Sequence, residues 1–183
     1  MLKLALGTIL AAVAMFIWGF FYWGSGLIDP FSHMSAEGET AIGDALKANL
    51  PADGVYFVPE PKHGTPEEWQ SRMSVGPVAM INFRSGGTAP MTQTMAFGFL
   101  HMLGTAILLA LVLQLVLPAA PAYPDRLKIA ALIGVLGAFE ANVGQPIWWH
   151  WPWSHALIAV GYAFGSYLIA GLILSYFVTP PKA

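Results

Sequence analysis

The stretch LALGTILAAVAMFIWGFFYWGSGLI, residues 4–28, is an apolar run without one charged side chain. A helix needs about 20 apolar residues to cross the hydrocarbon core of a bilayer, so this run is long enough to span it. The run continues well past the small residues 12–14, which would be the cleavage site of a signal peptide, so we expect an uncleaved anchor. The stretch therefore predicts a first transmembrane helix.

Three further apolar runs follow, at residues 95–117, 127–144 and 155–178. Of the 183 residues, 56% are hydrophobic and only 10% are charged, whereas soluble proteins have about 25% charged residues. Lipid forces backbone polar groups to pair within the protein, which favours helices over open loops at membrane depth. The sequence therefore predicts an all-α membrane protein, built as a four transmembrane helix bundle.

Composition also excludes several classes of function. The formal net charge is −2 and no basic patch occurs, so we expect no nucleic acid as a partner. The chain has no cysteine, which excludes disulfides, thiolate catalysis and cysteine-ligated metal centres. No phosphate-binding loop, dinucleotide fingerprint or hydrolase motif is present. No catalytic constellation is recognisable, so the chain is more readily interpreted as a binding protein than as an enzyme.

The polar segment 29–92 has the pattern of a small folded unit. Ser35 and Thr65 are typical N-cap residues, and each is followed by acidic residues in the first turn of a helix pattern. Two short β-branched and aromatic runs are typical of strands. The helix patterns lie at residues 35–51 and 65–73, and the strand patterns at 54–59 and 77–83. We expect a small α+β extracytoplasmic cap between the first and second transmembrane helices.

Orientation is predicted from the few cations at the membrane ends. Lys3, Arg126, Lys128 and Lys182 flank the apolar runs on one side. The positive-inside rule counts such short flanks and largely ignores a long loop such as 29–92. We therefore expect a multi-pass protein of the cytoplasmic (inner) membrane with both termini cytoplasmic.

A tryptophan-rich stretch, QPIWWHWPWSH at residues 145–155, precedes the last apolar run. Tryptophan and tyrosine gather where the bilayer meets water, because one end of each ring system is apolar and the other is polar. This stretch therefore predicts an aromatic belt at the outer membrane surface. The aromatic residues 18–23 at the end of the first helix are expected at the same level.

The phrase ALKANLPADGVYFVPEP, residues 45–61, resembles sequences of uncharacterised bacterial four-helix integral membrane proteins. The layout of four spans with a large first outer loop is also similar to that of claudins, but their tryptophan–cysteine signature is missing here. The resemblance implies the four-helix fold and carries no known activity.

Ionisable residues within membrane helices are costly and are therefore candidates for functional sites. His101 and Glu140 lie at similar predicted depths in the outer half of the bilayer, and small residues at helical spacing indicate that both point into the bundle. Asn142 and Gln145 extend the polar trend outward. We expect an outward-facing polar pocket with this floor, and its rim would carry Trp149, His150 and His155.

Two interpretations of this pattern stay open. A buried Glu–His pair can simply bridge two helices, and such contacts are worth about 0.6 kcal/mol on average. Alternatively, the pocket binds a membrane lipid or another hydrophobic ligand. The leading hypothesis is an integral membrane binding, accessory or assembly protein, whose further partner is a second membrane protein or another copy of the chain.

The alternative hypothesis is a membrane redox or metal-handling protein that uses haem, quinone or copper. A b-type haem needs two facing histidines, for which His101 and His155 are the candidates. A copper or zinc site would combine His150 and His155 with His33 or His63, although their spacing matches no standard motif. The sequence thus assigns no metal site and leaves the cofactor unknown.

Overall fold

The computed structural model describes residues 2–179, so Lys182, one of the flanking cations, lies outside the described residues. The chain divides into two compact units. The helical unit consists of the residues up to Pro30, Pro90–Ile147 and the residues from Trp151 onward. The inserted unit consists of Phe31–Ala89 together with Trp148–His150. Each unit is described by itself.

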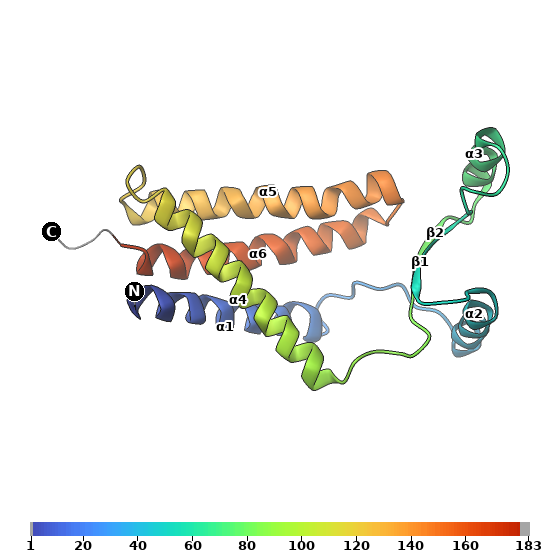
Figure 1. The fold of residues 1–183 in the computed structure, drawn as a ribbon, viewed down its shortest axis with the longest axis horizontal. Helices are drawn as coiled ribbons and strands as arrows, with labels where there is room; N and C mark the ends of the chain where they lie inside the picture. The colour runs from blue at the N-terminus through green and yellow to red at the C-terminus, as the bar shows by residue number, and fades with distance from the viewer. Residues whose placement is uncertain (1, 180–183) are drawn as a thin grey trace. The chain divides into compact units, whose positions relative to one another are not determined.

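The helical unit is made of four long helices (Figure 1). These are α1 (Leu2–Gly24), α4 (Met91–Leu115), α5 (Tyr123–Trp149) and α6 (Trp153–Phe177). Each is long and apolar enough to cross a membrane, which confirms the prediction of four membrane-spanning segments at this level. In Figure 1, α4 runs obliquely, and it packs on α1 and α6.

The helix ends differ from the ends of the apolar runs. Helix α1 stops at Gly24, because Gly26 adopts a left-handed φ of 74° and turns the chain away. Helix α5 was expected to end at residue 144, ahead of Pro146, but it continues through that proline to Trp149. A proline within a helix removes one backbone hydrogen bond and crowds the carbonyl four residues earlier, and Pro146 lies only three residues before the end of α5. All of the tryptophan stretch except residues 150–152 is therefore helical.

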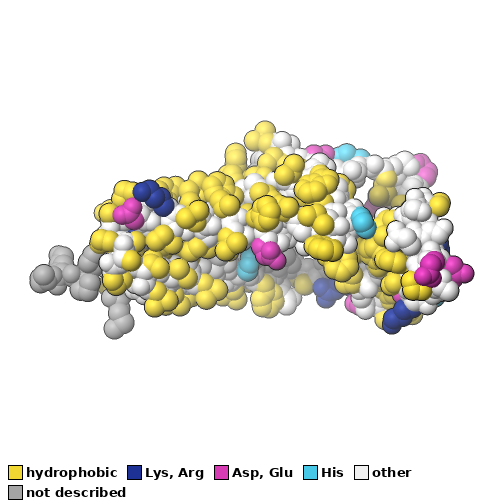
Figure 2. All heavy atoms as spheres, turned by 90° about the horizontal axis from the view of Figure 1, so that it is seen from above, with side chains coloured by type: hydrophobic (Ala, Val, Ile, Leu, Met, Phe, Trp, Pro, Cys, Tyr) yellow, Lys and Arg dark blue, Asp and Glu magenta, His cyan; other side chains and the backbone are white. Residues whose placement is uncertain are grey.

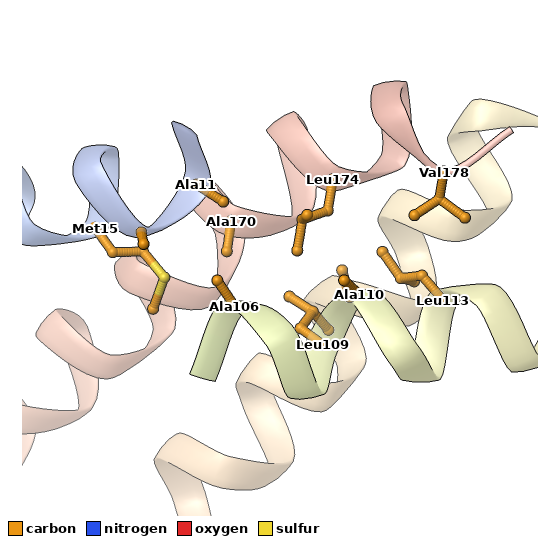
Figure 3. Close-up of a cluster of buried hydrophobic side chains, with 11 residues drawn as sticks. Ala11, Met15, Ala106, Leu109, Ala110, Leu113, Ala170, Leu174 and Val178 are labelled. Carbon is orange, nitrogen blue, oxygen red and sulfur yellow. The ribbon is translucent and has the colours of Figure 1, made fainter. Parts of the chain in front are cut away.

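Small residues bring α1, α4 and α6 close together (Figure 3). Ala11 and Met15 of α1 are buried against Ala106 and Leu109 of α4 and against Ala170 of α6. Alanine allows close approach of helix backbones, which is how membrane helices gain van der Waals contact where no hydrophobic driving force exists. The core thus combines alanines at the helix contacts with larger side chains such as Met15, Leu113 and Leu174.

Helix α5 joins α6 at two glycines. A Cβ at Gly171 of α6 would lie 2.6 Å from the Cβ of Ala130, and a Cβ at Gly134 of α5 would lie 2.6 Å from that of Tyr167. Atoms fixed to a backbone cannot give way easily, so both positions require a residue without a side chain. The same helices share a long-range cap: Arg126 is 3% exposed and donates to the carbonyl of Ser175 from Nε (3.2 Å) and Nη2 (2.8 Å).

The inserted unit contains two helices and a two-stranded antiparallel sheet. The helices are α2 (Ala36–Asn49) and α3 (Pro66–Val75), and the strands are β1 (Gly54–Val58) and β2 (Ala79–Phe83). Tyr56 pairs with Ile81 at the centre of the sheet. The β-branched and aromatic runs thus locate the two strands correctly, to within two residues at their ends.

Local hydrogen bonds define the ends of these elements. The Ser35 hydroxyl accepts from the N–H of Gly38 at 3.1 Å. Thr65 and Glu68 form a capping box, in which the Thr65 hydroxyl accepts from the Glu68 N–H (3.3 Å) and the Glu68 carboxylate accepts from the Thr65 N–H (2.8 Å). At the open end of the sheet, Asp53 Oδ1 accepts from both the N–H and the hydroxyl of Ser85 at 2.8 Å.

Candidate functional site

An open groove of about 340 Å³ lies on the helical unit between α1 and α4, and we call it the aromatic groove. Its walls come from α1 and α4, with one residue from α6. The lining residues are Phe16, Gly19, Phe20, Trp23, Gly24, Met95, Gly98, Met102 and Tyr162. The volume lies within the range of about 300–1,000 Å³ that is usual for small-molecule sites.

Ring contacts fix the walls of the aromatic groove. Phe16 meets Phe20 edge to face at a centroid distance of 5.2 Å, and it meets Phe99 of α4 at 5.7 Å. On the other side, the ring of Trp23 lies 5.3 Å from that of Tyr162. Aromatic pairs at these distances add roughly 0.5–1.5 kcal/mol beyond their buried area. These ring contacts therefore support the walls of the groove.

Two aromatic residues of α1 hold the helix against α6 just behind the groove. Trp18 Nε1 donates to the carbonyl of Tyr162 at 3.1 Å, and the Tyr22 hydroxyl donates to the carbonyl of Ile158 at 2.8 Å. Glycines make room for both rings, because a Cβ at Gly161 or Gly165 would lie 2.7 Å from Tyr22 or Trp18. Trp18 and Tyr22 are one helical turn apart, so the two hydrogen bonds connect α1 to α6 at two neighbouring points.

The Tyr162 hydroxyl gives the groove a polar group. No hydrogen-bond partner for this hydroxyl occurs in the part of the chain that the structure describes. A Cβ at Gly19 would lie 3.3 Å from the hydroxyl oxygen, so the missing side chain of Gly19 leaves the hydroxyl accessible. No lining residue is charged. The groove can thus bind an apolar molecule through contact and one carbonyl or hydroxyl group through a hydrogen bond.

His101 and Glu140 do not form the predicted buried floor. Both are exposed on the helical unit, whose surface is mostly hydrophobic (Figure 2). No hydrogen bond or ion pair joins their side chains within residues 2–179. The predicted inward orientation is wrong because both faces of a membrane helix are apolar, so its pattern does not identify the packed face. Gly98 and Gly137, used to choose the faces, do contact neighbouring rings.

Asn142 and Gln145 bond within their own helix. The Asn142 amide donates to the carbonyl of Ala138 at 3.0 Å, and the Gln145 amide donates to that of Ala141 at 3.2 Å. Such bonds one turn back satisfy a polar side chain without any partner helix. Both side-chain amides are therefore hydrogen-bonded within α5 itself.

Trp149 and His150 belong to the inserted unit. The ring of Trp149 lies 6.4 Å from that of Phe57. His150 has a left-handed φ of 59°, which is uncommon for a residue with a side chain, and it lines a small cavity of about 280 Å³ with Trp69 and Met73 of α3. The structure thus places Trp149 beside β1 and His150 beside α3 of the inserted unit, an arrangement that the sequence did not indicate.

His155 lies at the start of α6, where its Nδ1 is 2.9 Å from the carbonyl of Pro30. It is two residues into α6, whereas His101 is ten residues into α4, so their depths differ by roughly 12 Å at 1.5 Å per residue. Among residues 2–179, no three histidine, aspartate or glutamate side chains come together as a metal ion would require. The haem and copper hypotheses remain predictions.

The residues of the aromatic groove were missed as site residues. Residues 18–23 were interpreted as part of an interfacial belt, which describes where they lie but not what they enclose. The available signal was the spacing of glycines among the aromatic residues of α1, at Gly19 and Gly24. Comparisons with protein-family models, with curated proteins and with solved structures find no match for this chain.

Proposed function

We propose that this chain is an integral membrane binding protein that holds an uncharged amphipathic molecule in the aromatic groove. The molecule would carry an apolar tail and a flat or carbonyl-bearing head, as an isoprenoid quinone does. The observation that carries the proposal is the unpartnered Tyr162 hydroxyl in an otherwise apolar, aromatic-lined groove. A hydroxyl there is costly unless something bonds to it, and a ligand carbonyl satisfies it.

The lining also indicates what the ligand is not. A charged head would have no counter-ion in the groove, because its polar content is one phenol. Met95 and Met102 supply thioethers that adapt to irregular shapes and pack well against rings. An aromatic or quinonoid head stacked near Trp23 fits this surface better than a phosphate does.

Binding can be tested by thermal unfolding in detergent with a benzoquinone that carries a decyl tail. A ligand at 100 times its Kd stabilises a protein by about 2.7 kcal/mol, so a clear rise in the midpoint is expected. Gly98→Leu should abolish the rise, because its Cβ would touch Phe16 at an ordinary 3.5 Å and its longer branches would fill the groove.

The matched control is Gly104→Leu, on the same helix, where a Cβ would meet nothing within 4 Å. It should respond to the quinone as the wild type does. Tyr162→Phe should weaken binding about fivefold, the usual value of one hydrogen bond. An equal rise in wild type and Gly98→Leu would show that the quinone binds elsewhere and would remove the groove from the proposal.

We place the protein in the cytoplasmic membrane with both termini on the cytoplasmic side, with membrane lipid as its first partner. Lys3 and Lys128 support this orientation, because cations favour the cytoplasmic flanks of membrane helices. Ser85→Cys and Ala119→Cys should therefore react with an impermeant thiol reagent from opposite sides. Reaction of both from one side would contradict the orientation.

Accessory or assembly roles remain part of the proposal because of Glu140. It is exposed in the middle of α5, where an uncovered carboxylate in hydrocarbon is costly. A second membrane protein or a second copy of the chain that covers Glu140 would remove this cost. A quinone in the aromatic groove would also suit the redox alternative, whereas haem and copper have no comparable supporting contact within the described residues.

A further inference from the structure

A second groove, of about 470 Å³, lies between α1 and α6, away from the aromatic groove. Its main lining residues are Leu10, Val13, Ala14 and Ile17 of α1 and Ile173 and Tyr176 of α6. The small side chain of Ala14 leaves space at the centre of the groove, and the larger side chains of Leu10 and Ile17 form its edges. We call it the α1–α6 groove.

A lysine lies at one end of this groove. Lys3, Leu10 and Ile17 are seven residues apart, which is close to two helical turns, so they share one stripe of α1. The Lys3 ammonium lies 5.7 Å from the centre of the Tyr176 ring, and Tyr176 also lines the groove. The cation and the apolar surface therefore form one continuous strip.

The charge of Lys3 is available to a ligand. Lys128 pairs with Asp125, with 3.3 Å between nitrogen and oxygen, whereas Lys3 has no carboxylate partner within residues 2–179. Its contact with the Tyr176 ring uses one side of the ammonium and leaves its other donors unused. The Tyr176 hydroxyl is a second possible donor, because the residue is 65% exposed.

The strip is long enough to span the hydrocarbon of one leaflet of a bilayer. From Lys3 to Ile17 is 14 residues, or about 21 Å along a helix. Half of a hydrocarbon core is about 15 Å thick. An acyl chain whose head group lies level with Lys3 would thus run along the groove to its far end near Ile17.

We propose that the α1–α6 groove is a binding site for an anionic phospholipid. One acyl chain lies in the groove, and the phosphate accepts from the Lys3 ammonium and the Tyr176 hydroxyl. A zwitterionic head group would bring its own cation next to Lys3, so a net negative lipid is preferred. This site is independent of the aromatic groove, which contains no charged residue and faces α4.

The test is native mass spectrometry of the full chain, released from detergent that contains equal amounts of dioleoyl phosphatidylglycerol and dioleoyl phosphatidylcholine. The wild type should retain phosphatidylglycerol about fivefold more often, the contribution of one lysine near an anionic surface. Lys3→Gln should remove this preference. Lys128→Gln, which changes an exposed lysine that already has a partner, should keep it.

A second variant tests the groove itself. Ala14→Phe would fill the centre of the groove and should lower the retention of both lipids, because the acyl chain loses its place. The unfolding midpoint of each variant in lipid-free detergent identifies any loss of folding. Equal retention of the two lipids by the wild type, or an unchanged preference in Lys3→Gln, would overturn the proposal. Neither result would bear on quinone binding in the aromatic groove.

Discussion

The two units of this protein differ in the side-chain hydrogen bonds that stabilise each of them internally: the helix caps of the inserted unit are short in sequence range, whereas the bonds between helices of the helical unit are long. In the inserted unit, the caps of α2 and α3 connect residues three positions apart, as in Ser35 to Gly38. In the helical unit, α4 and α6 begin at prolines without a side-chain cap. The side-chain bonds that fix its helices connect distant residues instead, such as Trp18 with Tyr162 and Arg126 with Ser175.

The difference follows from what surrounds each unit. None of residues 31–89 is buried, so the inserted unit has little apolar packing and depends on local caps and turns to compete with water. The helical unit has four apolar helices whose internal bonds are not challenged by water in a bilayer. In the helical unit, glycines that allow close approach and side-chain donors that reach a distant carbonyl determine which helix faces pack together. Local bonds define elements, whereas distant bonds define an arrangement.

The largest expected effect comes from breaking a distant bond. Arg126→Met should destabilise the helical unit by roughly 3 kcal/mol, because it leaves the carbonyls of Ser175 and Ala120 without their donor. Ser175 is in the last turn of α6, where carbonyls lack intrahelical partners. Unfolding by an anionic detergent titrated against a neutral one measures the loss.

The control for this prediction is Lys128→Met, two residues away. Lys128 is exposed and pairs only with Asp125, one turn earlier, so its loss should cost less than about 0.5 kcal/mol. If both variants lost the same stability, then the charge at this end of α5 would matter rather than the long-range cap, and the contrast between the units would fail.

A smaller effect is expected from removing a local cap. Thr65→Ala deletes the hydroxyl that accepts from the Glu68 N–H and should cost about 1 kcal/mol, confined to α3. Amide hydrogen exchange of Glu68 and Trp69 reports it directly. Pro90→Ala at the start of α4 removes no side-chain bond and should leave exchange in that helix nearly unchanged. Comparable increases in both helices would break the comparison.

The smallest expected effect is a pH dependence at the open end of the sheet. The N–H and then the hydroxyl of Ser85 hold the pKa of Asp53 below its ordinary value of 3.8. A carboxylate with a lowered folded pKa stabilises the fold above the unfolded pKa and loses this contribution as the pH falls through the folded value. Exchange at the Ser85 amide should therefore rise only below about pH 3.8. Asp53→Asn should show no such rise, and a rise in both would assign it to another group.

How far the sequence predicts the site differs between the two units. Ser35 and Thr65 were recognised as N-caps because a cap depends on residues within one turn. His101 and Glu140 were placed inside the bundle, yet both are exposed. Their faces were chosen from glycine spacing, and in an apolar helix small residues occur on more than one side. The aromatic groove needs residues of α1, α4 and α6 together, and no local pattern connects them.

The sequence by itself determined the number of helices long and apolar enough to span a membrane, the small sheet and the capped helices of the inserted unit, since hydropathy, strand propensity and caps act within a few residues. Tertiary structure alone decided which faces of the spans meet, because Gly161, Gly165 and Gly171 become contact points only when a ring or another backbone approaches. It also decided that Tyr162 lines a groove and that Arg126 caps a helix distant in the sequence. Because each face of these helices is largely apolar, hydropathy does not determine which faces pack together. Complementary shape and a few hydrogen-bond donors determine it, and both depend on residues from several helices.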